Sequence, residues 1–85
     1  MDEMAKLRNA LDNAKIEWED RSSLHPKFQR THFFIGKTFY SVITGPYAYG
    51  GDKGLLESMP PIHNDTYCDD VEGWLTAQDI IDALL

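Results

Sequence analysis

The side chains of this chain that could act in catalysis are several serines, one cysteine and three histidines. The candidate nucleophiles are Ser22, Ser23, Ser41, Ser58 and Cys68, and the candidate bases are His25, His32 and His63. A nucleophile becomes reactive when a base lies within hydrogen-bond reach and a third group orients that base. None of these residues stands in an established nucleophile motif, so we expect a non-enzymatic protein with no catalytic residue.

A metal site is the second chemistry to test. His63, Asp65, Cys68 and Asp69 lie close together in sequence. Zinc sites usually carry paired, closely spaced Cys or His ligands, and here one Cys and one His stand alone. We therefore expect no metal and no cofactor.

The segment Gly45–Gly54, "GPYAYGGDKG", has the composition of a ligand-holding loop. Its glycines allow close backbone approach, exposed backbone N–H groups can hold an anion, and its tyrosines offer flat surfaces. The segment nevertheless matches neither the Walker motif nor the dinucleotide-binding G-x-G-x-x-G pattern. A plain glycine-rich connection between strands is the alternative interpretation, and the sequence leaves both open.

Charge is distributed unevenly along the chain. The net charge is −6, yet all eight Lys and Arg lie at or before Lys53, and residues 55–85 carry seven acids and no base. Residues 21–53 hold five bases against the single acid Asp52, together with seven of the aromatic residues. An acidic protein thus has a basic, aromatic centre. The overall acidity disfavours a nucleic-acid polymer as partner, whereas a single small nucleotide would respond mainly to its own pocket.

The elements that must position these residues are predicted from periodicity. Apolar residues spaced by three and four predict a helix over residues 2–15, capped by Asp2. "KIEWED" alternates as a short strand, and "THFFIGKTFYSVI" predicts a hairpin turning at Gly36 and Lys37. "GLLESM" is a further candidate strand. Thr76 with Asp79 forms a capping box before a last helix, whose expected buried stripe is Ala77, Ile80, Ile81, Leu84 and Leu85.

These elements predict an α+β fold: an antiparallel sheet of three to four strands with an N-terminal and a C-terminal helix. In the hairpin, strand alternation predicts Phe33 and Ile35 on one face and His32 and Phe34 on the other. Both faces are at least partly apolar, so we expect helices on one face and a loop or a partner on the other. The chain of 85 residues is expected to form a single domain over residues 1–85. It shows neither a signal-peptide layout nor an apolar run long enough for a bilayer, and the lone Cys68 suits a reducing compartment. We expect a cytoplasmic protein without a membrane partner.

Six stretches of the chain carry a resemblance. They are "MDEMAKLRNALDNAKIEW", "RTHF", "YSVITG", "YGG", "KGLLE" and "GWLTAQDII". Together they resemble a group of small uncharacterised proteins encoded by phages and prophages of Gram-positive bacteria. The resemblance implies the host bacterial cytoplasm as the location and counter-defence against host immunity as the role.

Counter-defence can follow two routes. In the first, a homo-oligomer sequesters a small nucleotide immune signal in shared pockets. The residues expected to hold base and ribose are Tyr47, Tyr49, Gly50, Gly51 and Lys53, and those expected to meet phosphate are Arg21, Arg30 and His32. In the second route, an acidic surface inhibits a host defence protein as CRISPR inhibitors do. The residues of that surface would be Asp65, Asp69, Asp70 and Glu72, with Tyr67 as an anchor. A small structural or regulatory phage protein is a third possibility.

Overall fold

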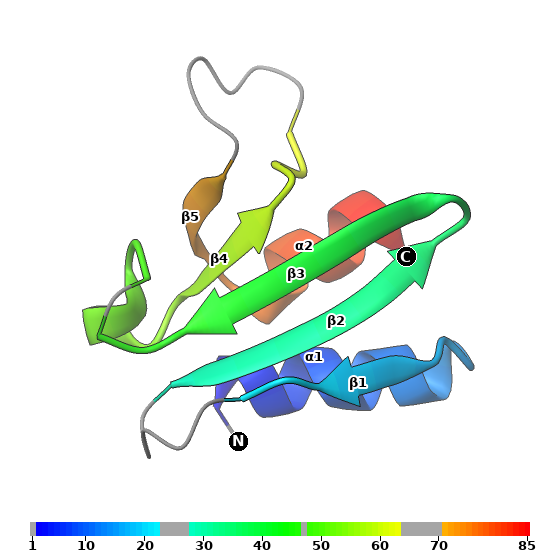
Figure 1. Cartoon of the computed structure of the whole chain (residues 1–85), viewed down its shortest axis with the longest axis horizontal. Coiled ribbons are helices and arrows are strands. Elements are labelled where there is room, and N and C mark those ends of the chain that lie inside the picture. The colour runs from blue at the N-terminus through cyan, green and yellow to red at the C-terminus, as the bar shows by residue number, and fades with distance from the viewer. Residues whose placement is uncertain (1, 23–27, 47, 64–70) are drawn as a thin grey trace.

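The computed structural model describes residues 2–22, 28–46, 48–63 and 71–85. The elements are α1 (Glu3–Asn13), β1 (Trp18–Asp20), β2 (Gln29–Ile35), β3 (Thr38–Thr44), the short 3-10 helix η1 (Gly51–Lys53), β4 (Leu56–Met59), β5 (Glu72–Leu75) and α2 (Ala77–Leu84). The five strands pair in the order in which they occur in the chain, and each pair is antiparallel. The predicted α+β fold with a helix at each end is confirmed (Figure 1), and the described residues form five strands instead of the predicted three or four.

Both helices begin at the residues that the sequence predicts. The carboxylate of Asp2 accepts a hydrogen bond from the Ala5 N–H (2.7 Å), which satisfies one of the free donors of the first turn. Thr76 and Asp79 form the predicted capping box, each side chain accepting the other's backbone N–H. In α2 the fully buried residues are Ala77 and Ile80. The prediction that Leu85 is buried is wrong, because its side chain is 46% exposed.

The β2–β3 hairpin turns at Gly36, which takes φ +61° as a two-residue turn of this kind requires. Phe33 lies opposite Tyr40 and Phe34 opposite Phe39. Because side chains alternate between the faces of a strand, this register sends Phe33 and Tyr40 to one face and Phe34 and Phe39 to the other. The predicted alternation is thereby confirmed: Phe33 is buried and Phe34 is exposed.

The hydrophobic core lies between the sheet and the two helices, which cover the same face of the sheet (Figure 1). Helix α1 contributes Met4, Leu7 and Leu11, each almost completely buried, and α2 contributes Ala77 and Ile80. The strands meet them with Phe33, Val42, Leu56 and Leu75. In the described part of the chain, the opposite face of the sheet carries no helix.

Strand β5 is the element that the sequence did not indicate. It holds only four residues, and its pairing with β4 shifts register between Leu56 and Ser58. Trp74 lies within it at φ +61°, an unusual backbone conformation for a bulky residue. A bulged strand of this length breaks the alternation by which strands are recognised in sequence.

Arg8 of α1 connects the helix to the two nearest strands. Its Nε donates to the Thr31 hydroxyl (2.8 Å), and Nη2 donates to the Asp20 carboxylate (3.2 Å) and to the Arg30 carbonyl (3.3 Å). Its guanidinium also lies 4.8 Å from the centre of the Trp18 ring. This side chain therefore fixes α1, β1 and β2 relative to one another.

Glu3 joins α1 to α2. Its Oε1 accepts the Ala77 N–H (2.7 Å), one of the free donors at the start of α2, and its Oε2 pairs with Lys6. The Ala77 N–H, followed by Lys6, lowers the pKa of Glu3 below its ordinary value of 4.5. A carboxyl whose pKa falls on folding stabilises the protein above its unfolded pKa, and this contribution is lost as the pH falls through the folded value.

Replacing Glu3 with glutamine is expected to lower the free energy of unfolding by about 1 kcal/mol at pH 7, because the hydrogen bond to Ala77 loses its charge. The difference from the wild type should shrink as the pH falls through the lowered pKa of Glu3, because the wild-type carboxyl then takes up a proton. Urea unfolding of both proteins at pH 7 and pH 3 measures this difference in the free energy of unfolding. A difference that stays constant across this range would contradict the assignment.

In the described part of the chain, neither helix has the length and apolar character needed to cross a membrane.

Candidate functional site

The candidate site lies on the helix-free face of the sheet, the face turned away from α1 and α2. The strand register places nine residues on it: Glu19, Arg30, His32, Phe34, Phe39, Ser41, Ile43, Glu57 and Met59. Phe34 (59%), Phe39 (41%) and Met59 (47%) are exposed, although large apolar side chains usually pack in a core. Exposed rings beside charged groups are typical of a binding surface.

Arg30 places a guanidinium group on the helix-free face. Its backbone bonds to Ser22, Arg8 and Arg21, but its guanidinium makes no ion pair with any described residue. Its Nε is buried and, among the described residues, is the one buried side-chain nitrogen or oxygen without a hydrogen-bond partner. The group lies 5.2 Å from the Phe28 ring centre. A buried donor without an acceptor is rare in proteins, and an anionic ligand would satisfy it.

His32 lies on β2 beside Arg30, and its ring meets the edge of the Phe39 ring (centroids 4.9 Å apart). Phe39 in turn contacts Phe34 at 5.3 Å, so three rings form a continuous aromatic surface. Burial lowers the pKa of His32 below its ordinary value of 6.5, and the nearby Arg30 and Arg21 lower it further. The imidazole is therefore neutral at pH 7 and can both donate and accept a hydrogen bond.

Arg21 follows β1 and is engaged by its neighbour. Its Nη2 lies 2.6 Å from the Glu19 carboxylate, with both side chains more than half exposed. An exposed pair of this kind contributes little to stability and is easily exchanged for another partner. Arg21 can therefore bind a phosphate when it releases Glu19.

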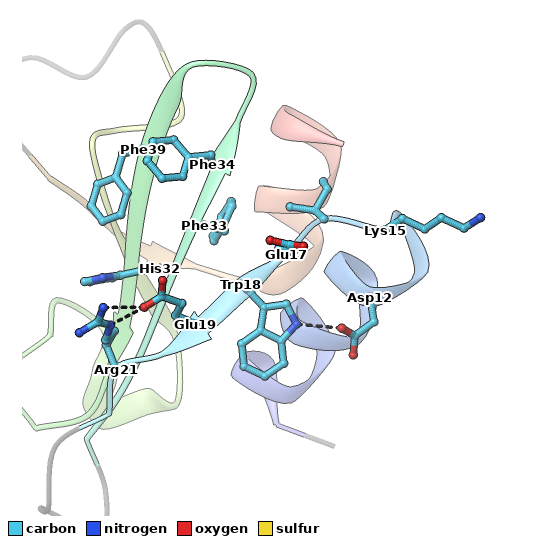
Figure 2. Close-up of a pocket in the computed structure, with 11 residues that line it drawn as sticks. Asp12, Lys15, Glu17, Trp18, Glu19, Arg21, His32, Phe33, Phe34 and Phe39 are labelled. Carbon is cyan, nitrogen blue, oxygen red and sulfur yellow. Dashed lines mark hydrogen bonds and ion pairs between the residues drawn. The ribbon is translucent and has the colours of Figure 1, made fainter.

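Two cavities meet at the helix-free face, and the larger one also reaches Phe33 on the helix-covered side of the edge strand β1. The larger, about 780 Å³, is lined by Arg21, His32, Phe34 and Phe39 and extends past β1 to Trp18 and Asp12. Figure 2 shows the aromatic rings and Arg21 on one side of β1, and Trp18 bonded to Asp12 on the other. The smaller cavity, about 240 Å³, lies over β3 and β4. Its walls are Arg30, His32, Phe39, Ser41, Ile43, Glu57, Met59 and Val71. His32 and Phe39 line both cavities, which together offer room for a ligand with two ring systems.

The glycines of the Gly45–Gly54 loop serve its packing. A Cβ on Gly51 would lie 1.9 Å from the Gly45 carbonyl oxygen, and one on Gly50 would meet the Trp74 backbone at 3.0 Å. Backbone carbonyls of the same loop accept the N–H groups of Ala48, Gly51, Lys53 and Gly54. These donors are thus already used within the loop. Gly51 lines a third cavity, about 570 Å³, on the side of Asp2 and Glu3.

The predicted site residues fall into two groups. Arg21, Arg30 and His32 come together beside the helix-free face. Tyr49 and Lys53 are exposed in the loop, whereas Gly50 and Gly51 pack inside it. Tyr49 connects the groups, because its N–H donates to Oε1 of Glu57 (3.0 Å) on the helix-free face. Tyr47 lies outside the described residues.

Sequence reasoning missed three residues of the site, namely Phe34, Phe39 and Glu57. The alternation expected for the hairpin sets Phe34 on the face opposite Phe33, but the sequence alone does not say which of the two faces the helices cover. Glu57 gives no signal in sequence, because only the pairing of β3 with β4 places it opposite Ile43.

Among the described residues, no group of three or more His, Cys, Asp or Glu is placed to hold a metal ion. Ser58 donates its hydroxyl to the Pro60 carbonyl, a structural contact. Cys68 and His25 lie outside the described residues, as do Asp65, Tyr67, Asp69 and Asp70 of the acidic alternative. Glu72, the remaining member of that set, is occupied by the backbone N–H groups of Ile62 and His63 and by the His63 ring.

Comparison with family models, with curated proteins and with solved structures finds no match to this chain.

Proposed function

We propose that this protein binds a small nucleotide on the helix-free face of its sheet and sequesters it without altering it chemically. The observation that carries the proposal is Arg30, a guanidinium without an ion-pair partner among the described residues, whose buried Nε lacks an acceptor. A phosphate oxygen supplies what that donor lacks. The proposal includes the phage setting that the resemblance implies, in which the nucleotide is a host immune signal in the bacterial cytoplasm.

The proposed roles follow from position. Arg30 and the neutral His32 bind a phosphate at the junction of the two cavities. Phe34 and Phe39 offer exposed ring faces on which a base stacks, worth about 1–3 kcal/mol per base in single-strand binders. Arg21 meets a second phosphate after releasing Glu19.

The Gly45–Gly54 loop has an indirect role in this proposal. Tyr49 holds Glu57 in place at the rim of the smaller cavity through its backbone N–H. Lys53 adds positive charge in an exposed position on the same loop. A homo-oligomer belongs to the proposal, because a second copy would close cavities that are open to solvent in one chain.

Thermal-shift and calorimetric titration with cyclic dinucleotides and cyclic ADP-ribose isomers tests the proposal. We expect at least one of these compounds to raise the melting temperature and to be recovered unchanged by mass spectrometry. A Kd of about 1 nM would correspond to about 12 kcal/mol and to a large shift. If none of the compounds shifts the melting temperature, sequestration is wrong, and inhibition of a host defence protein through the acidic residues takes its place. A ligand recovered in altered form would indicate an enzyme.

A further inference from the structure

Glu57 occupies an unusual position for a carboxylate. It lies on β4 opposite Ile43, and only 9% of the residue is exposed. No Lys, Arg or His among the described residues lies within ion-pair distance of it. Removing a charged carboxylate from water is costly unless hydrogen-bond donors replace the water. Within the described structure, the one donor it receives is the Tyr49 N–H, on Oε1.

The second oxygen of Glu57 is left for a ligand. Oε2 has no hydrogen-bond partner among the described residues, and it is not completely buried. It is therefore accessible, and the cavity that Glu57 lines is the smaller one on the helix-free face. An ionised carboxylate accepts hydrogen bonds and donates none. The group that occupies this cavity should accordingly present donors.

The cavity has the size of a single ring system. Its volume of about 240 Å³ lies below the range of roughly 300–1,000 Å³ typical of pockets that enclose a whole drug-sized ligand. Phe39, Ile43, Met59 and Val71 give it apolar walls. Arg30 lines the same cavity, so a ring seated there lies within reach of the proposed phosphate position.

We infer that the smaller cavity selects guanine, with Glu57 binding the donor edge of the base. This inference rests on the proposed nucleotide-binding function and specifies the base. Guanine presents two adjacent donors, N1–H and the 2-amino group, to the two oxygens of one carboxylate. Oε1 can accept from guanine as well as from Tyr49, because a carboxylate oxygen has two lone pairs.

Adenine and cytosine fit the same carboxylate poorly. Each places a ring nitrogen acceptor beside its amino group, so one carboxylate oxygen would face a lone pair. A site built to bind donors rejects a ligand that leaves a buried acceptor unpaired or opposed. The structure thus favours guanine nucleotides over adenine nucleotides of the same shape.

Isothermal titration with cyclic di-GMP, cyclic di-IMP, cyclic di-AMP and cyclic ADP-ribose tests the inference on the wild-type protein. We expect cyclic di-GMP to bind at least about 100-fold more tightly than cyclic di-AMP. Cyclic di-IMP, which lacks the 2-amino group but keeps N1–H, should bind about tenfold more weakly than cyclic di-GMP.

Glu57→Gln is the matched variant. Glutamine keeps an oxygen for the Tyr49 N–H and places an amide N–H₂ where Oε2 stood. An amide pairs with adenine, which offers one acceptor and one donor side by side. We expect the variant to lose its preference for cyclic di-GMP and to prefer cyclic di-AMP, with a melting temperature close to that of the wild type.

The outcomes separate the two proposals. Equal binding of the guanine and adenine compounds, tighter binding of an adenine compound or of cyclic ADP-ribose, or an unchanged preference in Glu57→Gln would overturn the guanine assignment and leave nucleotide binding intact. Failure of all four compounds to bind overturns both. If Glu57→Gln does not fold, the comparison of the three cyclic dinucleotides on the wild type still decides.

Discussion

Arg30→Gln is expected to weaken binding of the tightest nucleotide from the panel by about 100-fold, while the free energy of unfolding changes by less than about 1 kcal/mol. The large effect on binding follows from the loss of a charged, forked donor whose Nε has no acceptor among the described residues. The small effect on folding follows from the same fact, because the guanidinium makes no ion pair with the described residues that the variant could break. Calorimetric titration and urea unfolding of the variant measure the two quantities.

Two further variants isolate the cause. Lys37→Gln removes the same charge at the exposed hairpin turn and should leave the Kd within about twofold of the wild type, because surface charges at a distance are screened. Arg30→Lys keeps the charge but loses the buried Nε donor, and we expect about a tenfold loss. If Arg30→Gln and the wild type bound the nucleotide with equal affinity, the phosphate-binding role of Arg30, on which the proposed function rests, would be wrong.

Arg8→Met is expected to destabilise the fold by about 2–4 kcal/mol. The variant leaves the Thr31 hydroxyl and the Arg30 carbonyl without the donor that Arg8 supplies, and it ends the contact with the Trp18 ring. The Arg8 side chain is only 17% exposed, so water replaces these bonds poorly. For a domain of this size, each kcal/mol corresponds to a fall of about 4–8 °C in melting temperature. Thermal unfolding followed by circular dichroism measures the loss.

Lys6→Ala is the control on the same helix. Lys6 pairs with Glu3 at 3.0 Å, but its side chain is 52% exposed, and such pairs contribute about 0–1 kcal/mol. If Arg8→Met were no less stable than Lys6→Ala, the hydrogen bonds of Arg8 would contribute nothing net to the fold. The affinity for nucleotide should also fall in Arg8→Met, since Arg8 holds the backbone of Arg30.

Much of the fold could be predicted because helix caps, turns and strand alternation are determined by residues close together in the sequence. The caps at Asp2 and Thr76 act within one helical turn, and the turn at Gly36 needs only its two neighbours. The alternation around Phe33 and Phe34 predicted both faces of the hairpin correctly. In each of these cases the physical cause lies within a few residues of its effect.

The site was harder to predict, because its parts meet only in the folded sheet. Strand β5 depends on a register shift against β4 and on the bulge at Trp74, neither of which leaves a periodic trace. The glycines of the Gly45–Gly54 loop suggested an anion-binding loop. The structure gives a different reason for two of them: a side chain at Gly50 or Gly51 would collide with the backbone of Trp74 or Gly45. Glu57 acquires its burial from long-range pairing alone.

The order of the strands has a consequence for how the chain folds. Every strand pairs with its neighbour in sequence, so the sheet can grow by adding one strand after another through contacts of modest sequence separation, which favours rapid folding. The bond from Ala77 to Glu3 spans 74 residues, and the core beneath the sheet needs α2 as well as α1. During synthesis α1 and the sheet can form early, but the part of the apolar face that α2 covers stays open until residues 77–84 have left the ribosome. Cooperative folding is therefore expected only once residues 77–84 are free to dock.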